Sequence, residues 1–377
     1  MTAPRVGMVG AGQLARMTLP AAMALDVPFT VLAAGEEDAA VRAGARAVLG
    51  SPDSLEALER LAGIVDVVTF DHEVIPPEHL LRLEAGGRVL RPPPSANLLA
   101  QDKAEQRVRL SAAGVPVPAF SVVHGIGDLL SFGEEHGWPV VVKVARGGYD
   151  GRGVWVLDEP DEAWRLLAED AAGVGPWVAE ELVVLDRELA VLVARRPGGE
   201  AVAYPPVETV QAEGMLRESL APAPVSNALA AEAVALGLRV AALVGSVGIL
   251  AVEMFATGDG RLLVNELALR PHNSGHWTIE GAATSQFENH LRGVLDWPLG
   301  SVAARAAAVA TVNVVGGPEA RDPASALAAA LAVPGAHVHL YGKAPRPGRK
   351  LGHVTTLGED PEETLRRARR AAQALTG

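Results

Sequence analysis

The chain has 377 residues, of which 49% are hydrophobic and 21% charged, and its formal net charge is −12. This length predicts two or three domains, and the acidic charge argues against non-specific binding to nucleic acid, which needs a basic face. No cysteine occurs, which excludes disulfides and thiolate chemistry. Because we find no signal segment and no apolar run that approaches membrane-spanning length, we expect a cytoplasmic protein without membrane or nucleic-acid partners.

The first part of the chain, residues 5–91, alternates between strand-like and helical patterns. The strand-like runs lie at 6–9, 29–32, 65–70 and 89–90, and the clearest helical stretches at 13–25 and 54–61. This alternation predicts an open parallel sheet wound with helices.

The first run leads into Gly10-Ala11-Gly12, with Ala15 in the place of a third glycine. This is the G-x-G-x-x-G/A motif of a strand–turn–helix that binds an anion at a helix N-terminus. The motif alone does not decide whether that anion belongs to NAD, so an NAD-dependent dehydrogenase is one alternative.

Proline-rich breaks at 91–95 and 114–118 enclose one predicted helix, from a cap at Ser95 to about residue 113. A smaller α+β unit follows from 120 to 181. Beyond it we expect longer, locally paired strands, with hairpins at 196–201 and 257–261, an alanine-rich helix at 228–244, strands at 308–315, 338–341 and 353–357, and a helix from 361. The domains are accordingly expected at 1–98, 99–183 and 184–377.

A second glycine-rich stretch, "KVARGGYDGRGVWVL", runs from Lys143 to Leu157 between two strand-like runs. It lacks the Gly-Lys-Ser/Thr of a Walker loop. A hairpin tip whose N–H groups fold over phosphates fits better, with Lys143 as a point charge on the leading strand. The alternative is a flexible hairpin with exposed charges.

Two glutamates lie on the strands that flank the turn Gly258-Asp259-Gly260. Symmetrical pairing about this turn sets Glu253 opposite or diagonal to Glu266, within otherwise apolar stretches. Facing carboxylates destabilise a strand pair, and a cation between them removes that cost. Oxygen ligands without His or Cys favour Mg²⁺; the alternative is two solvated side chains on the outer face of the sheet.

The stretch that follows, from Arg270 to Trp277, contains too many polar residues for a simple connection. It is typical of one side of a binding site for substrate or anions. Further on, Lys343, Arg346, Arg349 and Lys350 form a basic cluster that an acidic protein would need for a phosphate-bearing substrate. A basic surface turn is the alternative for these four.

In combination and in order, these residues resemble the ATP-grasp carboxylate–amine ligases over essentially the whole chain. More narrowly, "GAGQLARM", "GGYDGRGV", "NELALRPHNSGHWT" and "YGKAPRPGRKLGHV" are similar to the 5-(carboxyamino)imidazole ribonucleotide synthetases of purine biosynthesis. The resemblance implies an α/β and α+β ATP-grasp fold with a Rossmann-like N-terminal domain, a small central lid domain and a mixed-sheet C-terminal domain.

The resemblance also implies an activity and its ligands. ATP would phosphorylate bicarbonate, and the carboxyphosphate would carboxylate the exocyclic amine of aminoimidazole ribonucleotide. The implied contacts to ATP are Lys103, Lys143, Gly148, Tyr149, Asp150, Gly151, Arg152, Gly153, Val154, Glu180, Glu181, Leu182, Val183, Glu188, Asn265 and Glu266, with Mg²⁺ on Glu253 and Glu266. A homodimer is what the family implies.

The remaining roles concern the reaction itself. We expect Arg270 and His272 to hold bicarbonate and carboxyphosphate, and Tyr149, Asp150 and Arg152 to meet the aminoimidazole, with Asp150 as proton acceptor. Expected contacts to the ribonucleotide substrate are Gly12, Gln13, Asn273, Ser274, Lys343, Arg346, Arg349 and Lys350.

Three positions depart from the family pattern. Gln211 stands where relatives commonly carry a histidine, Asp71 where Glu is more frequent, and Lys103 where Arg is frequent. A nucleotide contact at Gln211 is therefore not expected. The remaining rivals are another ATP-grasp purine-precursor ligase, such as formate-dependent glycinamide ribonucleotide transformylase, and a catalytically silent nucleotide-binding subunit.

Overall fold

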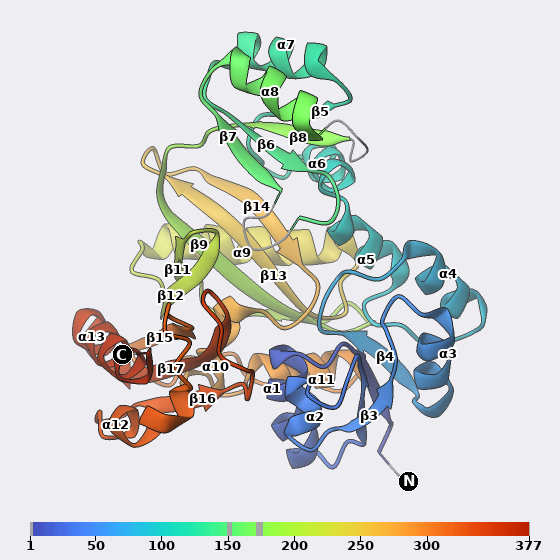
Figure 1. Cartoon of the computed structure of the whole chain (residues 1–377), viewed down its shortest axis with the longest axis vertical. Coiled ribbons are helices and arrows are strands. Elements are labelled where there is room, and N and C mark those ends of the chain that lie inside the picture. Colours follow the sequence, from blue (N-terminus) through green and yellow to red (C-terminus); the bar gives the residue numbers. More distant parts are fainter. Residues whose placement is uncertain (1–2, 149–152, 171–175, 377) are drawn as a thin grey trace.

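The computed structural model describes residues 3–148, 153–170 and 176–376, which form three sheets with helices packed on them (Figure 1). In Figure 1 the N-terminal sheet lies at the lower right, a small sheet at the top, and the largest sheet runs through the middle to the C-terminal helix at the lower left. The predicted division into a parallel N-terminal sheet, a small central α+β unit and a larger C-terminal sheet is confirmed, but the described strand pairs of the C-terminal sheet are all antiparallel, whereas a mixed sheet was expected.

The N-terminal sheet is parallel, in the order β3-β2-β1-β4. Its strands are β1 Val6–Val9, β2 Phe29–Ala33, β3 Arg46–Leu49 and β4 Val67–Phe70, and its helices α1 Gln13–Ala24, α2 Ala39–Arg42, α3 Leu55–Ile64 and α4 Pro77–Ala85. The strand β3 was not predicted, because its mostly exposed residues form no apolar run. The expected strand at 89–90 contributes only a single bridge, from Leu90 to Val68.

The helix predicted from Ser95 to about residue 113 was wrong in two respects, because the segment is two helices. These are α5 Pro94–Gln101, whose N-cap is Pro93, and α6 Lys103–Ala112. Asp102 leaves the helical region, and its side chain accepts a hydrogen bond from the Glu105 N–H, so it caps α6. The break turns α6 toward the small sheet, where the Lys103 N–H donates to the Ala145 carbonyl at 2.8 Å.

The small central sheet is antiparallel, in the order β5-β8-β6-β7. The strands are β5 Phe120–Val123, β6 Val140–Val144, β7 Val154–Leu157 and β8 Trp177–Glu181, accompanied by α7 Ile126–His136 and α8 Pro160–Asp170. A buried cluster that includes Leu129, Phe132 and Val142 joins the helices to the sheet. The small sheet also contacts α6, where Ala104 packs with Ala145 and Val178 in a second buried cluster.

The largest sheet has the order β14-β13-β9-β11-β12-β15-β17-β16, with β10 paired to β9. Its strands are β9 Leu185–Arg195, β10 Ala201–Ala203, β11 Val207–Ala212, β12 Met215–Ala221, β13 Gly248–Thr257, β14 Leu262–Ala268, β15 Ala308–Val315, β16 His337–Leu340 and β17 Lys350–Gly358. The helices that pack around it are α9 Asn227–Val244, α10 Thr278–Gly281, α11 Gln286–Val294, α12 Leu327–Leu331 and α13 Pro361–Thr376.

The expectation that no apolar run approaches membrane-spanning length needs one correction. By length and composition alone, α9 is long and apolar enough to cross a bilayer. One side of this helix, including Leu236, Val240 and Val244, packs against β9 and β13 in a buried cluster, as expected of a core helix.

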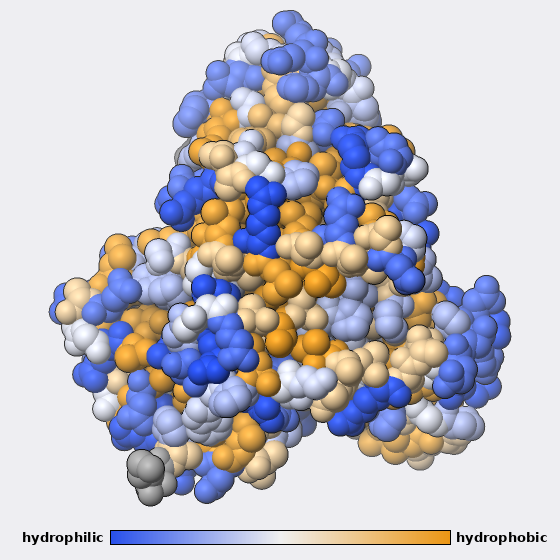
Figure 2. Space-filling model, turned by 180° about the vertical axis from the view of Figure 1, so that it is seen from behind, coloured by the Kyte–Doolittle hydropathy of each residue, from blue (hydrophilic) through white to orange (hydrophobic). Residues whose placement is uncertain are grey.

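From behind, the molecule shows apolar residues gathered across its middle and polar residues at its upper tip (Figure 2).

Candidate active site

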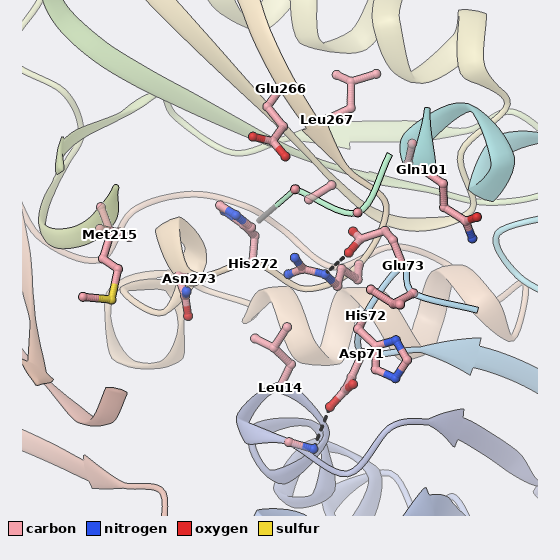
Figure 3. Close-up of a pocket in the computed structure, with 18 of the residues that line it drawn as sticks. Leu14, Asp71, His72, Glu73, Gln101, Met215, Glu266, Leu267, His272 and Asn273 are labelled. Atoms are coloured by element: carbon pink, nitrogen blue, oxygen red, sulfur yellow. Dashed lines mark hydrogen bonds and ion pairs between the residues drawn. The ribbon is translucent and has the colours of Figure 1, made fainter. Parts of the chain in front are cut away.

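The three sheets surround a pocket of about 930 Å³. Glu266 lies on one side of this pocket and Asp71 and Leu14 on the opposite side, with His272 and Glu73 between them (Figure 3). The predicted site residues that line it are Gly12, Gln13, Lys103, Gly148, Glu188, Glu253, Glu266, Arg270, His272, Asn273, Lys343, Arg349 and Lys350.

The two glutamates of the β13–β14 hairpin are direct cross-strand partners, as the turn predicted. Glu253 is the more buried, with 23% of its side chain exposed, and Glu266 is 48% exposed. Burial, together with the neighbouring carboxylates of Glu266 and Glu188, raises the pKa of Glu253 to about 8. A divalent cation would relieve this crowding, and oxygen-only donors suit Mg²⁺; the residues present therefore fit that ion.

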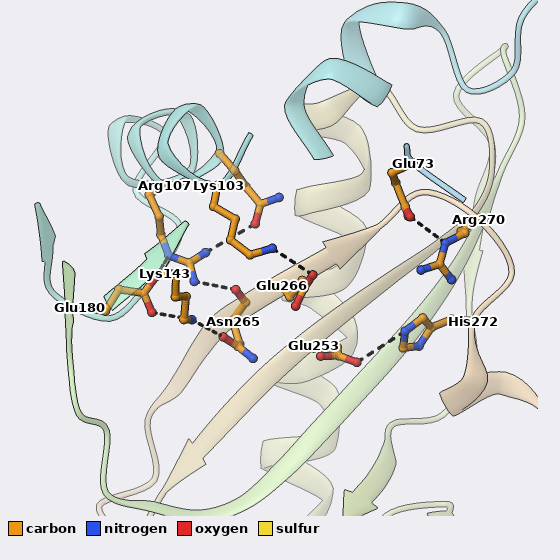
Figure 4. Close-up of polar contacts among 11 residues, drawn as sticks. Glu73, Lys103, Arg107, Lys143, Glu180, Glu253, Asn265, Glu266, Arg270 and His272 are labelled. Atoms are coloured by element: carbon orange, nitrogen blue, oxygen red, sulfur yellow. Dashed lines mark hydrogen bonds and ion pairs between the residues drawn. The ribbon is translucent and has the colours of Figure 1, made fainter. Parts of the chain in front are cut away.

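Nitrogen-bearing side chains flank this carboxylate pair. Lys103 Nζ lies 3.3 Å from Glu266 Oε1, and His272 Nε2 lies 3.6 Å from Glu253 Oε1 (Figure 4). Burial, with the nearby charges of Arg270 and Lys350, holds the pKa of His272 well below its ordinary value, so this imidazole is neutral at pH 7. A neutral histidine can accept as well as donate a hydrogen bond.

The Arg270 guanidinium is fixed by an acid that sequence analysis did not select. Its Nε donates to Glu73 Oε2 at 2.8 Å. Burial opposes the charged form of Arg270, but the charge and hydrogen bond of Glu73, together with the charges of Asp71 and Glu266, outweigh this effect, so the pKa of Arg270 is raised. A signal for Glu73 existed: it follows β4, and ligands of parallel sheets bind at the carboxyl ends of the strands.

The glycine turn after β1 holds an anion that belongs to the protein itself. The Gly12 N–H donates to Asp71 Oδ2 at 2.7 Å, and a Cβ on Gly10 would lie 1.9 Å from Asp71 Oδ1. The glycine spacing thus accommodates this buried carboxylate, whose pKa is raised by burial. Because the Gly12 N–H donates to Asp71, Gln13 is the residue of this turn that contacts other residues of the pocket.

Gln13 connects two walls of the pocket. Its Nε2 donates to Asn273 Oδ1 at 3.2 Å, and its Oε1 accepts from Lys343. Lys343 Nζ also lies 5.5 Å from the centre of the Tyr341 ring. Of the other residues expected to contact the ribonucleotide, Ser274 is fully buried with its hydroxyl 2.9 Å from His272 Nδ1, and Arg346 is exposed outside the lining.

Of the residues expected around ATP, some line the pocket and others lie behind its lining. Glu188 lines the pocket. Burial raises the pKa of its carboxyl, and a hydrogen bond from Gln211 opposes this rise without cancelling it. Lys143 and Asn265 lie behind the lining, bonded to each other at 3.1 Å. Glu180 is paired on both sides within the small sheet, and Glu181, Leu182 and Val183 carry the chain from β8 toward β9.

The glycine-rich hairpin is only partly within the described residues. Gly148 lines the pocket, and at the other end of the hairpin the turn residue Gly153 precedes Val154, the first residue of β7. Tyr149, Asp150, Gly151 and Arg152 lie outside the described residues, so their predicted roles stay predictions.

The small sheet over a pocket with paired carboxylates and basic side chains defines an ATP-grasp protein. The ATP-grasp domain model matches residues 108–287, the ribonucleotide synthetase preATP-grasp domain 3–101, and the phosphoribosylaminoimidazole carboxylase C-terminal domain 309–367. The chain belongs to the family of N5-carboxyaminoimidazole ribonucleotide synthases, which are ATP-grasp ligases.

Relatives of that name match almost end to end. The one from Mycobacterium tuberculosis (strain ATCC 25618 / H37Rv) is 48% identical over 384 residues, covering 99% of this chain and 88% of the relative. The crystal structure of the synthetase from Thermus thermophilus has a TM-score of 0.88 at 40% identity, covering 99% of this chain and 98% of the other. A synthase from Aspergillus clavatus, in complex with ADP and 5-aminoimidazole ribonucleotide, has a TM-score of 0.90 at 32% identity and covers 99% of both chains.

Proposed function

We propose that this chain is an N5-carboxyaminoimidazole ribonucleotide synthase, which uses ATP and bicarbonate to carboxylate the exocyclic amine of 5-aminoimidazole ribonucleotide in purine biosynthesis. The products are N5-carboxyaminoimidazole ribonucleotide, ADP and phosphate. The observation that carries the proposal is the facing pair Glu253 and Glu266 in one pocket with Lys103 and the Glu73-anchored Arg270.

In the proposed reaction, a bicarbonate oxygen attacks the γ-phosphorus of ATP and ADP leaves. The amine of the ribonucleotide then attacks the carbonyl carbon of carboxyphosphate, phosphate leaves with the bridging oxygen, and the amine loses a proton. Mg²⁺ on Glu253 and Glu266 would neutralise charge on the transferred phosphoryl group. Lys103 and Lys143 would orient the triphosphate, and Arg270 with neutral His272 would hold the bicarbonate and the carboxyphosphate.

The proposal also assigns the ribosyl phosphate site, the proton acceptor and the remaining ligands. The basic side chains Lys343, Arg349 and Lys350 would meet the ribosyl phosphate, and Asp150 would accept the amine proton. Mg²⁺ is supported by the oxygen-only donor set, bicarbonate by the cationic wall at Arg270, and a homodimer by the family resemblance alone. A cytoplasmic location stays a prediction.

The test is phosphate release from ATP, Mg²⁺ and bicarbonate, with and without 5-aminoimidazole ribonucleotide. We expect strong stimulation by the ribonucleotide. Stimulation instead by glycinamide ribonucleotide with formate would contradict the proposed substrate while leaving the ATP-grasp class intact.

A further inference from the structure

Arg107 is the one strongly buried arginine of α6, with 2% of its side chain exposed. Its Nε donates to Glu180 Oε1 at 2.7 Å, and its Nη2 donates to the Asn265 carbonyl at 2.6 Å (Figure 4). One guanidinium thereby joins the end of β8 in the small sheet to β14, the strand that carries Glu266.

The same two partners also hold Lys143. Glu180 Oε2 lies 2.7 Å from Lys143 Nζ, and Asn265 Oδ1 accepts from that ammonium at 3.1 Å. Arg107 and Lys143 thus share one carboxylate, each on its own oxygen. Since an ammonium has three donors, these contacts leave one N–H of Lys143 for a further acceptor.

The charges of this group do not cancel. Arg107 and Lys143 contribute two positive charges and Glu180 one negative charge, so the group carries a formal net charge of about +1. The side chains of Glu180 and Lys143 are only 3% and 12% exposed. In such surroundings electrostatic interactions are stronger than in water, and the excess charge favours a polyphosphate.

We propose that Arg107 is a positioning residue for ATP, which acts through Glu180 to align Lys143 and supplies the excess positive charge that the triphosphate meets. This inference rests on the proposed use of ATP. Without Arg107, Glu180 and Lys143 would form a neutral pair whose carboxylate has lost the guanidinium that holds its other oxygen. Without Glu180, two cations would remain and Lys143 would lose the carboxylate that anchors it.

The experiment measures the Kd for MgATP by calorimetry without the ribonucleotide, and kcat and KM in the phosphate-release assay. R107M should raise the Kd for ATP about tenfold or more, because it removes the excess charge. R107K should bring the Kd back to within about threefold of the unmodified enzyme, since it retains the charge. E180Q should lower kcat about tenfold or more without raising the Kd.

The matched control is R109M, the same substitution two residues further along α6. Arg109 is 56% exposed and its ion pair is with Glu105 at 3.9 Å, so we expect an unchanged Kd. A purely structural Arg107 would lower the melting temperature while the Kd for ATP stays unchanged, and this result would overturn the inference. R107K as weak in ATP binding as R107M would also overturn it.

Two further outcomes are decisive. If R107M does not fold, E180Q still tests the charge argument, because weakened ATP binding in E180Q would contradict it. If the unmodified enzyme binds ATP but the ribonucleotide does not stimulate phosphate release, the proposed function fails, while the ATP affinities of the variants still decide the role of Arg107.

Discussion

At the residue scale, Glu266 is the half-exposed member of the carboxylate pair and contacts Lys103. Glu266→Gln keeps the shape of the side chain but halves the charge available to a divalent cation. We expect turnover to fall about 100-fold or more, because such an ion contributes several kcal/mol to transition-state stabilisation. The free energy of unfolding should change by less than about 1 kcal/mol, since the lost ion pair is partly exposed.

The measurement is phosphate release beside thermal unfolding followed by circular dichroism. Glu59→Gln, at a side chain that is 49% exposed, pairs with Arg82 at 3.4 Å and lies outside the pocket lining, is the control and should change neither quantity. An unfolded Glu266→Gln protein, or one with full turnover, would count against the metal-binding role.

Gly10 offers a second test at this scale. Its φ is +99°, and a Cβ there would overlap the Asp71 carboxylate. Gly10→Ala should therefore cost about 1–2 kcal/mol for the left-handed backbone and about 1–3 kcal/mol for overpacking. Gly44 has a φ of +96° with nothing within 4 Å of an added Cβ, so Gly44→Ala should show the backbone cost alone. Urea unfolding of both variants checks this; equal losses would contradict the close approach of Asp71.

At the scale of elements, α6 carries Lys103 and Arg107 on one side, four residues apart, toward consecutive residues of β14. Its N-cap, Asp102, also pairs with Arg146 at 2.8 Å. Asp102→Ala should cost about 1 kcal/mol of stability as a lost cap and should lower kcat/KM for ATP about tenfold, because the cations of α6 lose their alignment.

Ser54→Ala provides the comparison for this cap. Ser54 caps α3 through the Ala57 N–H, far along the chain from the ATP contacts. We expect a similar loss of stability with no change in kcat/KM. If both variants lose activity to the same extent, the effect of Asp102 comes from stability and not from alignment.

Elements with strong local signals could be predicted from the sequence. The β13–β14 register follows from its glycine turn, and the parallel sheet from its alternating apolar runs, so the facing of Glu253 and Glu266 was predictable. The break between α5 and α6 was missed because the residues around Asp102 continue a helical pattern, although Asp102 followed by Glu105 is a local signal for a helix start. Arg107 was missed because, in one sequence, a buried arginine on a helix looks the same as a solvated one.

At the scale of the whole molecule, the pocket is lined by loops of the N-terminal sheet, by the segment that follows β6 of the small sheet, and by strands of the largest sheet. Binding of a ligand to the native state alone stabilises it by about 2.7 kcal/mol at 100 times its Kd. We expect MgATP to raise the melting temperature and NADH to leave it unchanged, because Asp71 takes the Gly12 N–H that a dinucleotide phosphate would need. Stabilisation by NADH alone would contradict this assignment of the glycine turn.

The molecule's proposed chemistry also makes a prediction about the fate of single oxygen atoms. Phosphorylation of bicarbonate joins one of its oxygens to the γ-phosphorus, and this oxygen leaves with phosphate when the amine attacks the carbon. Bicarbonate enriched in ¹⁸O should therefore place one ¹⁸O atom in each phosphate released during a turnover with ATP and 5-aminoimidazole ribonucleotide, as measured by mass spectrometry. Phosphate released without ¹⁸O, alongside the carboxylated ribonucleotide, would contradict the account.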